Sequence, residues 1–150
     1  MAQSLAKIAV HVVFSTKNRE PLLTTTIRSD IFAYSVGILN SLECITLAIN
    51  GTEDHVHALI GMSKTISLSK MMEEVKKGSS RRLSAQNMTA KHFAWQAGYG
   101  AFSVSESQIS TVVHYIEEQE KHHRKMTFQD ELISLLKKHN IEFDERYLWT

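Results

Sequence analysis

Hydrophobic residues recur along the chain with two different periods, and these periods predict alternating strands and helices. Residues 5–14 and 43–49 are short aliphatic runs that predict buried strands. The Asn-Gly pair at 50–51 predicts a hairpin turn, because this dipeptide suits the tight turns between paired strands. Residues 55–61 then predict a third strand, and residues 93–104 predict a fourth strand interrupted by glycines.

Helical spacing of apolar residues appears between these strands. Residues 27–42 predict one helix, and the loop over 18–26 that precedes it ends in threonines able to cap it. Residues 67–77 predict a second helix. Gly78 leaves open whether this helix continues toward Leu83, since glycine costs about 1 kcal/mol inside a helix.

Two capping signals predict further helices near the C-terminus. Residues 105–108, Ser-Glu-Ser-Gln, match a capping box and predict a helix running to residue 123. Residues 127–130 give a similar start signal for a helix over 131–140. The order strand-helix-strand-strand-helix-strand, followed by these helices, predicts a single α+β domain over 1–150. Its architecture would be ferredoxin-like, an antiparallel βαββαβ sheet with helices on one face plus C-terminal helices.

Composition narrows the class of protein further. The chain has 150 residues with 43% hydrophobic content, which suits one folded domain with its own core. Cys44 is the single cysteine, so an intramolecular disulfide and a CxxC metal site are both excluded. We find neither a signal-peptide pattern nor an apolar run long enough for a membrane span, and we therefore expect a soluble, cytoplasmic protein.

Charge is balanced overall but clustered locally. The formal net charge is +1, so the total gives no argument for a nucleic-acid partner. Residues 76–91 contain basic side chains and no acid, and a second basic cluster covers 121–125. Such patches can bind phosphate groups, but composition alone favours the alternative of a solvated helix face. The basic residues of the first patch are Lys76, Lys77, Arg81, Arg82 and Lys91.

Two histidines at the start of the predicted third strand form a candidate metal site. Side chains alternate along a strand, so His55 and His57 point to the same face, roughly 7 Å apart. Two imidazoles placed in this way can converge on one ion. The alternative is a pair of surface or hydrogen-bonded histidines. Asp54 should point away from the ion, and Val56 should pack behind the pair.

A tyrosine and a glutamine share one face of the predicted helix that follows residue 108. Tyr115 and Gln119 are four residues apart, and His122 lies one turn further along. Tyr115 lies at the edge of the apolar stripe, which also suits an ordinary boundary tyrosine with a wet hydroxyl. Together with the histidine pair, a Gln119 oxygen could complete a metal site, and the phenol could attack a phosphate bound there. Tyrosine needs activation for such an attack, and no general base is evident.

The motifs HVH at 55–57 and YIEEQ at 115–119 resemble the HUH superfamily, named for His-hydrophobic-His. Within it, the length and single tyrosine resemble the single-tyrosine insertion-sequence transposases (TnpA-like, of the IS-two-hundred type). The resemblance extends over nearly the whole chain. It includes the segments HVVFSTKNR, GTEDHVHALIG, SLSKMMEEVKKGSSRRL, WQAGYGAFSVS and IEFDERYLW.

The resemblance implies an enzyme that cuts and rejoins single-stranded DNA at the ends of an insertion sequence. His55, His57 and Gln119 would bind Mg²⁺ or Mn²⁺, and Tyr115 would form a 5′-phosphotyrosine link that leaves a free 3′-hydroxyl. The partner would be hairpin-containing DNA. The protein would be a homodimer whose active site is shared between chains. Lys17, Arg19 and the basic residues from Lys76 to Arg82 would be candidate DNA contacts. His114 would be structural or solvated, and no role is fixed for His122 or His123.

Two other functions remain open from the sequence. A domesticated relative could act as a nuclease on dispersed genomic hairpins, and the DNA that flanks the gene would distinguish it from a mobile element. A non-catalytic module could bind single-stranded nucleic acid on its sheet, since this fold hosts many functions. Such a module would bind single strands without metal-dependent cleavage.

Overall fold

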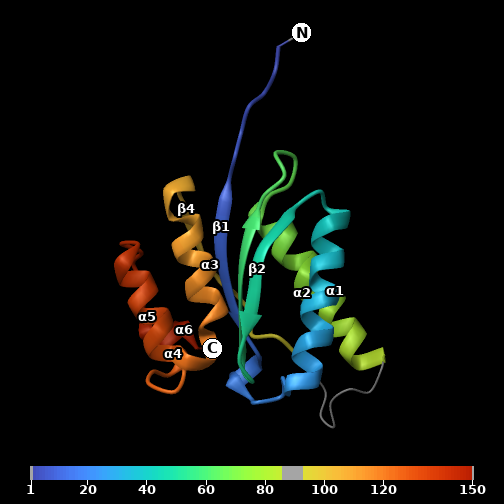
Figure 1. The fold of residues 1–150 in the computed structure, drawn as a ribbon. Coiled ribbons are helices and arrows are strands. Elements are labelled where there is room, and N and C mark those ends of the chain that lie inside the picture. Colours follow the sequence, from blue (N-terminus) through green and yellow to red (C-terminus); the bar gives the residue numbers. More distant parts are fainter. Residues whose placement is uncertain (1, 86–92, 150) are drawn as a thin grey trace.

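In the computed structural model, which describes residues 2–85 and 93–149, four strands form one antiparallel sheet in the order β2-β3-β1-β4 (Figure 1). This order and the alternation of strands with helices confirm the predicted ferredoxin-like α+β fold. Lys91 lies outside the described residues. The strands are β1 (Ala9–Ser15), β2 (Ile45–Gly51), β3 (His55–Gly61) and β4 (Gly100–Val104).

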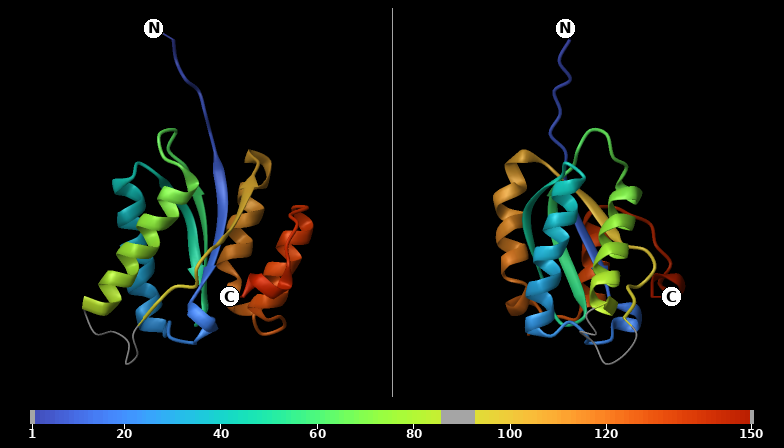
Figure 2. Two further views of the ribbon diagram at one scale, coloured as in Figure 1. Left: turned by 180° about the vertical axis from the view of Figure 1, so that it is seen from behind. Right: turned by 90° about the vertical axis from the view of Figure 1, so that its right-hand side faces the viewer.

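Helices cover both faces of the sheet. The predicted pair, α1 and α2, lies on one face, and the C-terminal helices α3 and α5 lie on the opposite face (Figures 1 and 2). None of the described helices is long and apolar enough to cross a membrane. The helices are η1 (Lys17–Arg19), α1 (Thr25–Ser41), α2 (Leu68–Ala85), η2 (Glu106–Gln108), α3 (Ile109–Glu117), α4 (Gln119–His122), α5 (Phe128–Lys138) and α6 (Glu145–Leu148).

Alternation along β3 decides what each face of the sheet presents. Val56, Ala58 and Ile60 belong to the apolar core beneath α1 and α2. The intervening residues point the other way, where Leu59 packs against Ile116 of α3. His55 therefore emerges beneath the C-terminal helices, on the face that the sequence pattern could not assign.

The first strand is shorter than predicted. Residues 5–14 were expected to be strand, but β1 begins at Ala9. Ala9 pairs with Gly61 on one side and Val104 on the other, and these are the last residues of β3 and β4. Residues 2–8 are exposed and lie beyond the ends of β3 and β4, although the Ile8 carbonyl oxygen still accepts from the Met62 backbone N–H at 2.8 Å.

The predicted hairpin is present, since β2 pairs antiparallel with β3, but its turn begins after residues 50–51 because both of them belong to β2. Asn50 pairs with His57 and Gly51 with Val56, and the chain reverses over the next three residues. Gly51 is required for packing here, since a Cβ atom on it would collide with the carbonyl oxygen of His55. Asn50 uses its side chain instead, donating from Nδ2 to the carbonyl oxygens of Ile116 (3.1 Å) and Glu117 (3.2 Å).

Glycines mark a close helix contact in α2 and the start of β4. The helix α2 runs through Gly78 to Ala85, and α1 packs so closely beside it that a Cβ at Gly78 would lie 2.5 Å from Ile38 Cδ1. The predicted strand over 93–104 is regular only from Gly100. Gly98, with a φ of +84°, lies between β4 and an isolated bridge from Trp95 to Thr16.

The two predicted capping signals have different outcomes. Thr127 caps α5, accepting from the Asp130 backbone N–H at 3.2 Å. Ser105 makes no side-chain cap, because a 3₁₀ turn precedes α3 and the Ser105 hydroxyl contacts Ser107. The helix predicted to reach residue 123 is also interrupted at Glu118, where α3 ends and α4 follows.

Candidate metal and nucleophile site

His55, the first residue of β3, is fully buried and held from behind. Its Nδ1 lies 2.7 Å from Asp54 Oδ1 and 2.9 Å from Thr52 Oγ1. The ring also stacks on Phe128 of α5, with 4.5 Å between ring centroids. These contacts fix the imidazole with Nε2 facing the C-terminal helices, an arrangement typical of metal-binding histidines. Asp54 does point away from the proposed ion, but it orients the ring.

His57 is equally buried and is held by a third histidine. Its Nδ1 lies 2.8 Å from Nε2 of His11, which occupies the middle of β1 and is 3% exposed. When His57 Nδ1–H donates to His11, the Nε2 of His57 keeps a free lone pair, as a metal ligand must. Val56, between the two site histidines, packs into the opposite core as predicted.

Tyr115 projects from α3 toward this histidine pair within the same chain. Its ring centroid lies 5.9 Å from that of His57, and the His122 ring stacks on its other side at 4.5 Å. The hydroxyl donates a short hydrogen bond to Glu131 Oε2. Gln119, one turn later, is fully buried, and its Oε1 lies 3.2 Å from His55 Nε2. The four predicted site residues therefore meet in one place.

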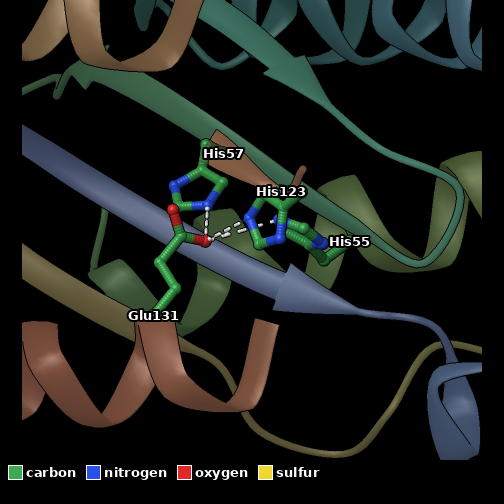
Figure 3. Close-up of side chains that lie close together, drawn as sticks. All are labelled: His55, His57, His123 and Glu131. Carbon is green, nitrogen blue, oxygen red and sulfur yellow. Dashed lines mark hydrogen bonds and ion pairs between the residues drawn. The ribbon is translucent and has the colours of Figure 1, made fainter. Parts of the chain in front are cut away.

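Two side chains from the C-terminal segment complete the cluster. Figure 3 shows the imidazoles of His55, His57 and His123 converging on one oxygen of Glu131. Their Nε2 atoms lie 3.4, 2.8 and 2.9 Å from Glu131 Oε1, in that order. One ligand atom from each of these four residues lies within 4.8 Å of the others. Nitrogen and carboxylate donors gathered this closely fit a divalent metal.

Burial and the Glu131 carboxylate set the charges in this cluster. Burial alone would lower the pKa of His55, but hydrogen bonds with Asp54 and Glu131 outweigh it and raise that pKa to about 9. Burial dominates at His57 and lowers its pKa to about 4. Burial would raise the pKa of Glu131, yet its histidine partners hold that pKa well below the usual range. Without an ion, the site therefore contains a carboxylate facing a protonated His55.

The same environment keeps the Tyr115 phenol protonated. Burial raises the pKa of Tyr115 above its ordinary value near 10, and the neighbouring Glu131 charge raises it further. Glu131 is the carboxylate that this hydroxyl contacts. An attack by Tyr115 therefore needs these contacts to change when substrate and metal bind.

The candidate DNA contacts lie in two different places. Lys17 and Arg19 follow β1 directly, and Ser15 at the end of β1 pairs with His55, so these two residues lie at the end of the sheet that carries the site. The other four lie on α2, which covers the opposite face. Lys76 donates to the carbonyl oxygens of Gln96 and Gly98 at 2.7 and 2.8 Å. Arg82 forms two 2.7 Å contacts with Asp30, whereas Lys77 and Arg81 are exposed.

Sequence reasoning missed Glu131, His11 and the role of His123. Glu131 falls on the buried stripe of α5 with Phe128 and Leu132, and a charged residue on an apolar stripe is a signal that could have been used. His11 is likewise a polar residue within an apolar strand. His123 lies four residues after Gln119, on the stripe that begins at Tyr115.

Comparison with known proteins agrees with this geometry. The family model described as "Transposase IS200 like" matches residues 4–119. The sheet with its His-x-His pair, facing the Tyr-x-x-x-Gln motif that runs from α3 into α4, defines the class of HUH-type single-tyrosine transposases. The chain belongs to the IS200-like transposase family within that class. No curated protein matches the chain.

Two solved structures share the fold. One is a protein of Deinococcus radiodurans R1 assigned as a transposase, with 23% identity, a TM-score of 0.61, and coverage of 79% of this chain and 98% of that one. The other is a REP-associated tyrosine transposase bound to a REP hairpin, with 16% identity, a TM-score of 0.63, and coverage of 82% and 73%. At these identities the likeness concerns the fold.

Proposed function

We propose that this transposase cleaves and rejoins single-stranded DNA at the ends of an insertion sequence through a 5′-phosphotyrosine intermediate. The observation that carries the proposal is the meeting of Tyr115 with His55, His57 and Gln119 in one buried site. The family membership supports the same reaction class.

Each residue has a distinct part in the proposed reaction. The Tyr115 oxygen attacks the scissile phosphorus and gives its proton to water, while the bond between phosphorus and the 3′-oxygen breaks and that oxygen takes up a proton from water to become the 3′-hydroxyl. In rejoining, a 3′-hydroxyl attacks the phosphotyrosine and the phenol is released. The phosphodiester energy stays in the covalent link, so no nucleotide cofactor is needed.

His55, His57 and Gln119 are the proposed ligands of a divalent ion, Mg²⁺ or Mn²⁺. When bound, such an ion supplies positive charge to the phosphate oxygens. Asp54 and His11 hold the two imidazole rings in the required orientation. Imidazole donors favour Mn²⁺ over Mg²⁺, so we expect the stronger binding with manganese.

The proposed substrate is single-stranded DNA with a hairpin near the cleavage point. The structural neighbour bound to a REP hairpin supports this choice. We propose that Lys17 and Arg19, which lie at the end of the sheet that carries the site, contact DNA phosphates near the cleavage point. More distant phosphates would be contacted by the basic residues of α2 on the opposite face, Lys76, Lys77, Arg81 and Arg82. A cytoplasmic location fits access to DNA during replication.

The reaction is tested by incubating the full-length protein and Mn²⁺ with single-stranded oligonucleotides that carry the hairpins flanking its own gene. We expect a covalent protein–DNA adduct on a denaturing gel and a free 3′-hydroxyl fragment. EDTA should prevent both products. Tight binding of the same oligonucleotides without any cleavage would instead indicate a non-catalytic binding module.

We also propose a homodimer whose two chains can share an active site. In the single chain, Tyr115 lies against its own His57, so a shared site would need α3 to move to the partner. Mixing a His57→Ala protein with a Tyr115→Phe protein under subunit exchange should then restore some cleavage. The matched control is each variant mixed with itself. Failure of the mixed sample to cleave would show that each site is built within one chain.

A second candidate is a domesticated enzyme that cleaves dispersed genomic hairpins. The observation that favours it is the fold shared with a REP-associated transposase. The two candidates use the same site and differ in their DNA. Hairpin-forming ends on both sides of the gene favour a mobile element, and scattered copies of one hairpin favour the domesticated enzyme.

A further inference from the structure

The Glu131 carboxylate lies at the centre of the site but has no part in the proposed reaction. Glu131 is 1% exposed and comes from α5, beyond residue 119, where the match to the family model ends. His123, its neighbour in the cluster, also lies beyond that point. Any role for these two residues therefore adds to what family membership assigns.

The two carboxylate oxygens have different surroundings. Oε1 faces the Nε2 atoms of His55, His57 and His123, all between 2.8 and 3.4 Å away. Oε2 accepts from the Tyr115 hydroxyl and from Gln119 Nε2 at 3.2 Å. The Glu131 carboxylate therefore contacts the three imidazoles through one oxygen and the Tyr115 hydroxyl through the other.

The orientation of Gln119 makes Glu131 the stronger candidate ligand. Gln119 uses its amide nitrogen on Glu131 Oε2, which leaves one neutral oxygen near His55. Glu131 offers a full negative charge at the point where three imidazoles converge (Figure 3). A carboxylate is a better ligand for a divalent ion than a carboxamide, because its charge compensates the ion in a buried site.

We propose that His123, which follows α4, and Glu131 of α5 are metal ligands beside His55 and His57, and that the Glu131 carboxylate takes the ligand position given above to the Gln119 oxygen. The site then has three imidazoles and one carboxylate for a divalent transition metal. The second oxygen of Glu131 positions the Tyr115 hydroxyl beside the ion. This inference rests on the proposed metal site of His55 and His57. Three nitrogen donors and one carboxylate select Mn²⁺, Co²⁺ or Zn²⁺ over Mg²⁺.

The rival explanation is that Glu131 blocks the metal site. In that case the carboxylate occupies the place of the ion or the scissile phosphate and must leave before either binds. The two explanations predict opposite changes when the charge is removed. Removing the charge of a ligand weakens metal binding, whereas removing the charge of a blocking group leaves metal binding unchanged or strengthens it.

Direct metal binding by the full-length protein separates these cases. Free Mn²⁺ is measured by electron paramagnetic resonance for wild type, Glu131→Gln, His123→Ala and His57→Ala. We expect Glu131→Gln to weaken Mn²⁺ binding by about 100-fold and His123→Ala by at least about tenfold. The matched control is Asp130→Asn, an exposed carboxylate on the same helix, which should change the affinity less than twofold.

Two further measurements keep the outcome clear if Glu131→Gln folds poorly. Glu131→Asp keeps the charge but shortens the reach, and we expect intermediate affinity. The visible absorption of bound Co²⁺, which reports its coordination, should change in Glu131→Gln and stay unchanged in Asp130→Asn.

Mn²⁺ binding that is unaltered or tighter in Glu131→Gln, while His57→Ala abolishes it, would overturn the ligand role and leave the proposed function intact. Binding that His57→Ala does not affect would overturn the proposed metal site itself, and this inference with it.

Discussion

Replacing Tyr115 with phenylalanine is expected to abolish the covalent protein–DNA adduct, with cleavage reduced by at least about 10³-fold. Phenylalanine keeps the ring contacts with His57 and His122, so only the attacking oxygen is lost. The variant also loses the hydrogen bond to the Glu131 carboxylate, which should cost about 2 kcal/mol of stability because the acceptor is charged. Adduct formation on a denaturing gel and the temperature of unfolding measure the two effects separately.

Tyr147→Phe is the matched control for this substitution. Tyr147 lies on α6 and is 69% exposed, so the same change of side chain should leave the adduct yield unaltered. If Tyr115→Phe forms the adduct as well as the wild type, another residue is the nucleophile and the proposed role of Tyr115 is wrong.

Replacing His57 with alanine is expected to remove Mn²⁺ binding and to reduce cleavage by about 10³-fold. The ring is fully buried, and its Nε2 lies at the point where the site nitrogens converge. His114→Ala is the control, because His114 is an exposed histidine on the helix that carries Tyr115. The unfolding temperature of both variants shows whether loss of binding reflects loss of structure. Undiminished Mn²⁺ binding by folded His57→Ala protein would exclude this residue as a ligand.

The same binding measurement has a characteristic pH dependence in the wild type. His55 has a pKa raised to about 9, so it carries a proton at pH 7 that an ion must displace. The apparent affinity should therefore rise about tenfold per pH unit from pH 7 and level off above pH 9. A flat profile over this interval would show that His55 loses no proton on binding.

The periodicity of the sequence was sufficient to predict which side chains share a face within a single strand or helix. Alternation placed His55 and His57 on one face of a strand. The spacing of four predicted Tyr115 and Gln119 on one helix, whereas the structure has Tyr115 on α3 and Gln119 at the start of α4, after the break at Glu118. The structure brings these two pairs together. The turn predicted at 50–51 lies at 52–54 instead, because Asn50 and Gly51 still pair with β3, and Asn50 also contacts the end of α3, far away in the sequence.

The remainder of the site depends on how separate elements dock. Glu131 reaches the histidines only because α5 packs on the same face as α3, and no periodicity within α5 reports that face. His11 contacts His57 because β1 lies beside β3, where His11 pairs with Leu59 and its ring reaches diagonally to His57 on the same face. Neither relation can be derived from spacing along one segment.

The packing of α5 links the chemistry of the site to the stability of the C-terminal third of the chain. Phe128 stacks on His55, and Glu131 inserts among the site histidines, so the same side chains fasten α5 to the sheet. A ligand that binds only when α5 is packed on the sheet adds its binding free energy to the stability of that packing. Occupancy of the site and attachment of α5 are therefore linked equilibria, so that a ligand in the site holds the C-terminal helix in place.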